Sequence, residues 1–148
     1  MKRAFDDNAD ETARAKAKRT VGRRGLSGLA NDTKWKEFYA GLRDLLSRMN
    51  FDEWPSWRFK PVDGEVSHWD RELQYHAPPA ILVEWMDIAY LREVRDRRLP
   101  PNARTVDYRS PIVALLQRTG LEFECGQKHI RIFGYAPKSM ELFDEDED

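Results

Sequence analysis

Large apolar side chains recur at three- and four-residue spacing in residues 33–50. Charged side chains occupy the opposite side of the same stretch, so one stripe of a helix would be buried and the other solvated. Asn31, Asp32 and Thr33 supply side chains that cap a helix N-terminus. The pattern therefore predicts a helix over about residues 33–50, with an apolar stripe of Trp35, Phe38, Tyr39, Leu42, Leu45, Leu46 and Met49.

The apolar period shortens to two residues in the middle of the chain, which is the alternation of β-strands. Asp63-Gly64 separates two alternating runs and is typical of a hairpin turn. Pro78-Pro79 interrupts the pattern before its most apolar run. We predict three strands here: residues 58–62, residues 65–69 with a continuation at 72–76, and residues 81–88, the last of them central in a sheet.

The second half of the chain begins with an arginine-rich stretch, predicted as a short helix over residues 90–98 and then an exposed loop. Ser110-Pro111 is typical of a helix start, and Gly120 lies where a glycine commonly ends a helix. Residues 122–125 and 129–135 flank a short turn and predict a closing hairpin.

This order of elements favours an α+β fold. It consists of a mainly antiparallel sheet of about five strands, with two main helices packed on one face of the sheet. We expect one domain at residues 32–136, because a chain of 148 residues has the size of a single domain.

The two ends of the chain differ from its middle. Residues 1–31 contain too few large apolar side chains to pack against a core, and we expect a flexible basic arm with at most a short helix over residues 9–18. Residues 137–148 form an acidic tail, expected to be disordered. Residues 1–32 carry eight Lys or Arg against five Asp or Glu, and residues 137–148 carry one against six.

Apolar runs are too short for a membrane span, and the N-terminus lacks the apolar stretch of a secretory signal. The single cysteine, Cys125, leaves no internal disulfide to form. A cytoplasmic protein is therefore predicted, with no membrane partner.

Candidate catalytic and metal-binding groups are few. His68, Asp70 and His76 could share one face of a strand, but no Cys pair or HExxH motif supports a metal site. Cys125 and His129 lack an orienting third group, and a half-buried Cys125 acting as a small hydrophobe is the favoured interpretation. We predict no catalytic residue, no metal and no cofactor.

Aromatic residues beside arginines are the stronger functional signal, because such pairs are typical of protein-binding hot spots. Trp54, Trp57 and Trp69 lie in turns or polar segments, whereas Trp35 and Trp85 fit amphipathic core patterns. The predicted partner-binding residues are Trp54, Trp57, Arg58, Trp69, Asp70, His76, Arg92 and Arg95.

Five short motifs carry a resemblance to a known family. They are N-x-T-K-W at 31–35, W-R-x-K at 57–60, G-x-V-S-x-W-D at 64–70, Y-H at 75–76 and E-W-x-x-I at 84–88. The series resembles a family of small bacterial proteins that carry an uncharacterised domain, over roughly residues 31–135. Leu73, Pro78-Pro79 and the insertion at residues 92–104 depart from that pattern.

The resemblance implies no activity and no catalytic residues. Together with the missing reaction motifs, it favours a non-enzymatic domain that binds one protein partner, by analogy an immunity-like antitoxin of bacterial competition systems that blocks a toxin. The alternative is a nucleic-acid-associated accessory protein that uses the basic N-terminal arm. A near-neutral domain and an acidic tail argue against strong duplex binding.

Overall fold

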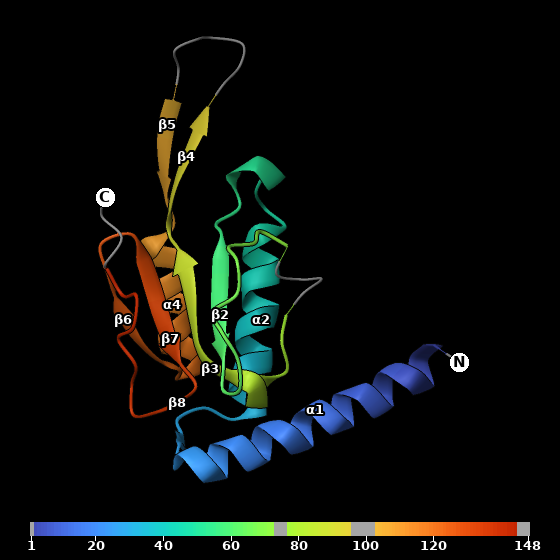
Figure 1. The fold of residues 1–148 in the computed structure, drawn as a ribbon. Helices are drawn as coiled ribbons and strands as arrows, with labels where there is room; N and C mark the ends of the chain where they lie inside the picture. The colour runs from blue at the N-terminus through green and yellow to red at the C-terminus, as the bar shows by residue number, and fades with distance from the viewer. Residues whose placement is uncertain (1, 73–76, 96–102, 145–148) are drawn as a thin grey trace.

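The computed structural model describes residues 2–72, 77–95 and 103–144. Its centre is a four-stranded antiparallel sheet in the order β2-β3-β7-β6 (Figure 1). The strands are β2 (Trp57–Pro61), β3 (Val83–Ala89), β6 (Glu122–Cys125) and β7 (His129–Phe133). The α+β prediction is confirmed, and the apolar run at 81–88 does supply a central strand.

Two helices cover one face of this sheet, α2 (Asp32–Leu46) and α4 (Arg109–Thr119) (Figure 1). The Asn31 side chain caps α2 by accepting a hydrogen bond from the Lys34 amide at 2.9 Å. The two helices approach closely at Gly41, where a Cβ atom would stand 2.4 Å from a methyl carbon of Leu115. Gly120, with φ 77°, ends α4 as predicted.

The hydrophobic core lies between these helices and the sheet. The apolar stripe of α2 packs against inward-facing side chains of the central strands. Along each strand these side chains alternate with side chains that point to the opposite face. Core residues include Trp35, Phe38, Leu42, Met86, Ile88, Ile112, Leu116, Ile130 and Ile132.

The predicted helix over residues 90–98 is wrong, because β4 (Leu91–Arg95) lies there and pairs with β5 (Ala103–Asp107). The arginines are good helix formers, but cross-strand pairing outweighs this weak local preference. The resulting hairpin extends beyond the central sheet (Figure 1). A third pairing joins β1 (Ser27–Gly28) to β8 (Tyr135–Ala136). The expected five-stranded sheet is therefore one sheet of four strands and two small ones.

The segment after the turn at Asp63-Gly64 returns along β2 without forming a regular strand. Its Ser67 amide donates to the Phe59 carbonyl at 2.9 Å, and Asp70 pairs with Trp57 as an isolated bridge. The hairpin prediction thus holds for the path of the chain but not for the strand at 65–69. Most of the predicted strand at 72–76 lies outside the described residues.

The N-terminal segment is a long helix, α1 (Lys2–Arg24), and not an arm with only a short helix. Gly22 lies within it, and the helix ends before Gly25, which has φ 68°. Ala17 and Thr20 are buried. Arg24 donates to the Glu84 carboxylate and to the Val62 carbonyl, both at 2.8 Å. Contacts with the domain thus stabilise a helix that its sequence alone would leave marginal.

Candidate functional site

The sheet face away from the helices carries charged and aromatic side chains. At its centre is Asp87 of β3, which is fully buried. Arg131 of β7 donates to both Asp87 oxygens, from Nε at 2.7 Å and from Nη2 at 3.0 Å. Arg58 of β2 adds a third bond, from Nε at 3.0 Å. The register explains this meeting, because Arg58 and Arg131 are the cross-strand partners of Asp87 on either side.

Tryptophan rings lie against both arginines. The guanidinium carbon of Arg131 is 3.5 Å from the ring centroid of Trp85, and that of Arg58 is 4.5 Å from the ring centroid of Trp69. Trp85 is fully buried, whereas Trp69 is 42% exposed. Cation–π contacts therefore connect the buried ion pair to an exposed aromatic surface.

His129 of β7 completes the group. Its Nε2 atom is 3.5 Å from an Asp87 oxygen and makes no hydrogen bond among the described residues. Burial lowers the pKa of His129, the Asp87 charge opposes this, and the nearby Arg58 and Arg131 charges lower it further. The imidazole is therefore neutral at pH 7, and its contact with Asp87 is not an ion pair there. We call Arg58, Trp69, Trp85, Asp87, His129 and Arg131 the Asp87 cluster.

Part of the C-terminal segment lies over this cluster; we call residues 139–144 the C-terminal cover. Arg131 Nη1 donates to the Ser139 carbonyl at 2.9 Å, and Arg58 Nη2 donates to the Leu142 carbonyl at 3.3 Å. The Phe143 ring meets the His129 ring edge-on, with 5.3 Å between centroids. The expected disorder of this tail is therefore wrong for the cover, while residues 145–148 lie outside the described residues.

The composition of the Asp87 cluster indicates the kind of ligand group that it could bind. A carboxylate and an imidazole meet here, both are buried, and the His129 ring lies between the rings of Trp69 and Phe143. The pair of guanidinium groups outnumbers the one carboxylate, so the cluster favours an anionic ligand group. No hydroxyl or thiol is among its six members.

Two of the predicted partner-binding residues, Arg58 and Trp69, belong to this cluster. Asp70 lies beside them, and its backbone pairs with Trp57. The surface position predicted for Trp57 is wrong, because its ring faces the helices and is only 4% exposed. Its place at the start of a strand, next to a polar segment, made it look like a loop residue.

The other predicted residues lie elsewhere. Trp54 is half-buried, and its indole nitrogen donates to the Leu46 carbonyl at 3.0 Å. Arg92 donates to the Asp52 carbonyl at 3.2 Å, near the base of the β4–β5 hairpin. Arg95 is the last residue of β4, and His76 lies outside the described residues. Trp54 and Arg92 therefore contact other parts of the protein and are not members of the Asp87 cluster.

Sequence reasoning missed four members of the cluster: Trp85, Asp87, His129 and Arg131. A usable signal was present, because Asp87 and Arg131 interrupt two strongly apolar strands at positions that face the same side. A charged residue in a central strand is costly unless it is paired. Charged residues of opposite sign that interrupt two apolar strands in this way therefore indicate that they pair with each other.

Cys125 is exposed, contrary to the expected half-burial, and it pairs in register with Ile130, so it faces away from His129. Among the described residues, no three His, Cys, Asp or Glu side chains converge as a metal site would require. None of the described helices has the length and apolar character needed to cross a bilayer.

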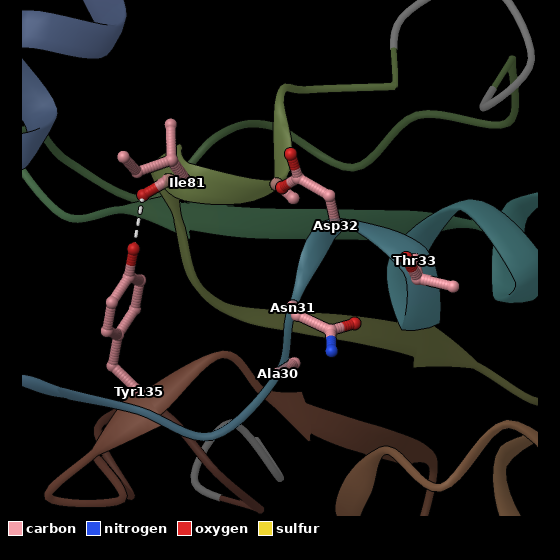
Figure 2. A pocket seen from close by; sticks show the side chains of 7 residues that line it. Ala30, Asn31, Asp32, Thr33, Ile81 and Tyr135 are labelled. Atoms are coloured by element: carbon pink, nitrogen blue, oxygen red, sulfur yellow. Dashed lines mark hydrogen bonds between the residues drawn. The ribbon is translucent and has the colours of Figure 1, made fainter.

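An open depression of about 470 Å³ lies at the start of α2 (Figure 2). Two of its polar side chains already have partners within the protein. The Tyr135 hydroxyl donates to the Ile81 carbonyl at 2.8 Å, and Asn31 caps α2. Asp32 is then the remaining charged group in its wall. A lone carboxylate in an open depression is a weaker candidate than the cluster.

Comparison with known proteins gives one match. A family model, described as a family of unknown function (DUF6678), matches residues 17–139. No curated protein and no solved structure matches the chain. The matched residues include all six members of the Asp87 cluster and end at the first residue of the C-terminal cover. Because the match spans most of its length, the chain belongs to the family of unknown function DUF6678.

Proposed function

We propose that this protein is a non-enzymatic binding domain that holds one protein partner against the Asp87 cluster. The observation that carries the proposal is the pair formed by Arg58 and Trp69. The tryptophan ring is 42% exposed, and the arginine stacked on it is fixed by the buried Asp87. A rigid, half-exposed aromatic beside an ordered arginine is the usual composition of an interface hot spot.

The immunity-like antitoxin remains the form of this proposal that we favour. Such a protein needs a rigid surface and no reaction chemistry, which agrees with a cluster that has no hydroxyl or thiol among its six members. Localisation in the cytoplasm, where such a protein would meet its toxin, is part of the same proposal.

The proposal is tested by capturing partners from the cells that encode the protein. Wild-type protein should retain one stoichiometric protein, and Trp69→Ala should weaken retention by about 30-fold, since hot-spot truncations cost about 2 kcal/mol or more. Phe51→Ala is the matched control, because Phe51 is 47% exposed and is also covered by an arginine, Arg71, at 4.6 Å.

Two results would contradict the proposal. One is the absence of any stoichiometric partner, and the other is a partner lost with Phe51→Ala but retained with Trp69→Ala. The antitoxin form has its own test, in which the captured protein is expressed alone and together with this domain. Growth arrest by the partner alone, relieved by co-expression, is expected.

A second candidate function is nucleic-acid binding through α1. Residues 12–24 carry six Lys or Arg and no acidic residue, and the side chains of Arg14, Lys16, Lys18 and Arg19 are exposed. A basic helix can neutralise phosphates along one strand. Replacing these four residues by Gln should abolish salt-sensitive retention on RNA or DNA, and wild-type protein that shows no such retention rules the function out.

A further inference from the structure

The C-terminal cover ends in an aromatic and an acidic residue, Phe143 and Asp144, and it lies on a cationic surface. Arg58 and Arg131 give this surface two positive charges against the one negative charge of Asp87. Phe143 packs between His129 and Arg131, with 5.4 Å from its ring centroid to the guanidinium carbon. The Asp144 carboxylate accepts a hydrogen bond from the Gln127 amide at 2.9 Å. The cover therefore binds as a short peptide ligand would, through one aromatic anchor, backbone carbonyls and one carboxylate.

The cover is held under backbone strain. Leu142 has φ 62° and Asp144 has φ 58°, both in the left-handed region. Asp tolerates this region, but for Leu it costs about 1 kcal/mol. The close approach also depends on Gly126, where a Cβ atom would stand 2.5 Å from the Asp144 carboxylate. Strain in a surface segment favours its release when a better ligand competes.

The Asp87 cluster also contains two buried ring nitrogens that the cover does not use. Trp85 Nε1 and His129 Nε2 have no hydrogen-bond partner among the described residues, although both side chains are more than nine-tenths buried. Each such group costs about 1–3 kcal/mol when it is desolvated without a partner. A ligand with an additional acceptor could use them, so the cover is a suboptimal occupant of this surface.

From these observations we propose that the C-terminal cover occupies the binding site of an acidic, aromatic-bearing peptide segment of the partner, and that partner binding displaces it. The inference rests on the proposed protein-binding function and names the chemistry of its ligand. The cover would act as a competitor built into the chain. The family match agrees with this role, because the cluster lies inside the matched residues and the cover beyond Ser139 lies outside them.

The test uses the full chain and a labelled peptide of its own residues 138–148. Fluorescence anisotropy should show weak binding to wild-type protein, because the tethered cover competes at an effective concentration in the millimolar range. Phe143→Ala removes the aromatic anchor from the tethered cover only. It should raise peptide affinity about tenfold or more, and added salt should weaken binding.

Met140→Ala is the matched control, because Met140 lies in the cover and is 47% exposed. Its affinity for the peptide should equal that of wild type. A peptide with Ala at the position of Phe143 should not bind to any form. Circular dichroism of each variant reports whether it is folded, and Phe143→Leu, which keeps an apolar anchor, serves if Phe143→Ala unfolds.

Three outcomes would overturn the inference. In the first, the peptide fails to bind the folded Phe143→Ala and Phe143→Leu variants. In the second, it binds wild type and Phe143→Ala with equal affinity. In the third, a single-stranded oligonucleotide binds Phe143→Ala and the peptide does not. Any of these leaves partner capture through Trp69 unaffected. A failure of the capture experiment alone, with the peptide still binding, would instead count against the proposed function.

Discussion

The two faces of the central sheet are stabilised in different ways. The face under α2 and α4 is apolar and closed by residues that interdigitate, such as Met86, Ile130 and Ile132. The opposite face holds Asp87 and Arg131, both with no exposed surface, under a segment of six residues. Burying charge beneath so small a cover costs more than burying an apolar side chain there would.

This difference suggests a division of roles. On the helix face, burial of apolar side chains supplies the stabilisation, and the buried core residues there carry no charge. The ordered arginines of the cluster face make the protein less stable than an apolar layer at the same positions would. Such arrangements are expected where a surface must present fixed charges to a ligand, and the following predictions test that division of roles.

The largest effect is expected for Asp87→Asn. It leaves Arg58 and Arg131 without their carboxylate, and the free energy of unfolding should fall by about 3–5 kcal/mol. Chemical denaturation measures this. The double variant Asp87→Leu with Arg131→Leu should lose less than the sum of the two single variants, because no unpaired carboxylate remains. If the stability losses of the two single variants add up to that of the double variant, Asp87 and Arg131 are not energetically coupled.

A somewhat smaller loss is expected on the helix face. Ile132→Ala creates a cavity beneath α2 and α4 and should lower the free energy of unfolding by about 2–4 kcal/mol. Binding of the peptide of residues 138–148 should be unchanged while the protein is folded. A changed peptide affinity in this variant would show that the two faces are coupled and would contradict their separate roles.

Phe143→Ala should have a moderate effect on stability, about 1–2 kcal/mol, because the side chain is half-buried. Phe143 packs on Arg131, which lies over the Trp85 ring, so its loss should loosen this cover and acrylamide should quench tryptophan fluorescence more strongly. The measurement is cleanest in a Trp69→Phe background, which removes the exposed indole of the cluster. Unchanged quenching would show that Phe143 does not shield this face.

The smallest effect concerns pH. Burial holds the pKa of His129 below its ordinary value of 6.5, so the unfolded chain binds this proton more readily than the folded one. The stability contributed by the neutral imidazole is therefore lost as pH falls below 6.5. His129→Gln should flatten the pH dependence of unfolding between pH 6.5 and 5. An identical slope in both proteins would contradict a buried, neutral His129.

Glu84 affects stability at lower pH and should not obscure this result. Burial alone would raise its pKa, but the hydrogen bond from Arg24, with the charges of Lys60 and Arg24, outweighs burial and lowers it. Its contribution is therefore lost only as pH falls below the ordinary carboxylate range. The two groups titrate in separate windows.

The sequence predicted the helix face well, because that face obeys periodicity. The stripe from Trp35 to Leu46, the strand around Met86 and the glycine that ends α4 each follow local rules. The β4–β5 hairpin could not be predicted in this way. In this hairpin Leu91 lies opposite Asp107, and the local conformational preferences of the residues do not predict that pairing.

The candidate site was predicted only in part, for a related reason. Arg58 and Trp69 were recognised by residue type, but Asp87 and Arg131 lie 44 residues apart and meet only through strand register. The same limit applies to α1, whose attachment depends on Arg24 reaching Glu84. A short stretch of sequence contains only one partner of such an ionic contact, so the contact cannot be predicted from that stretch.

The positions of the two chain ends have a practical consequence for handling the protein. The N-terminus lies at the far end of α1, well away from the sheet, whereas the C-terminal segment lies on the Asp87 cluster (Figure 1). An affinity tag or fluorophore attached before residue 2 would therefore leave the cluster accessible. The same group fused after the C-terminal cover would follow, a few residues along the chain, the segment that binds the cluster.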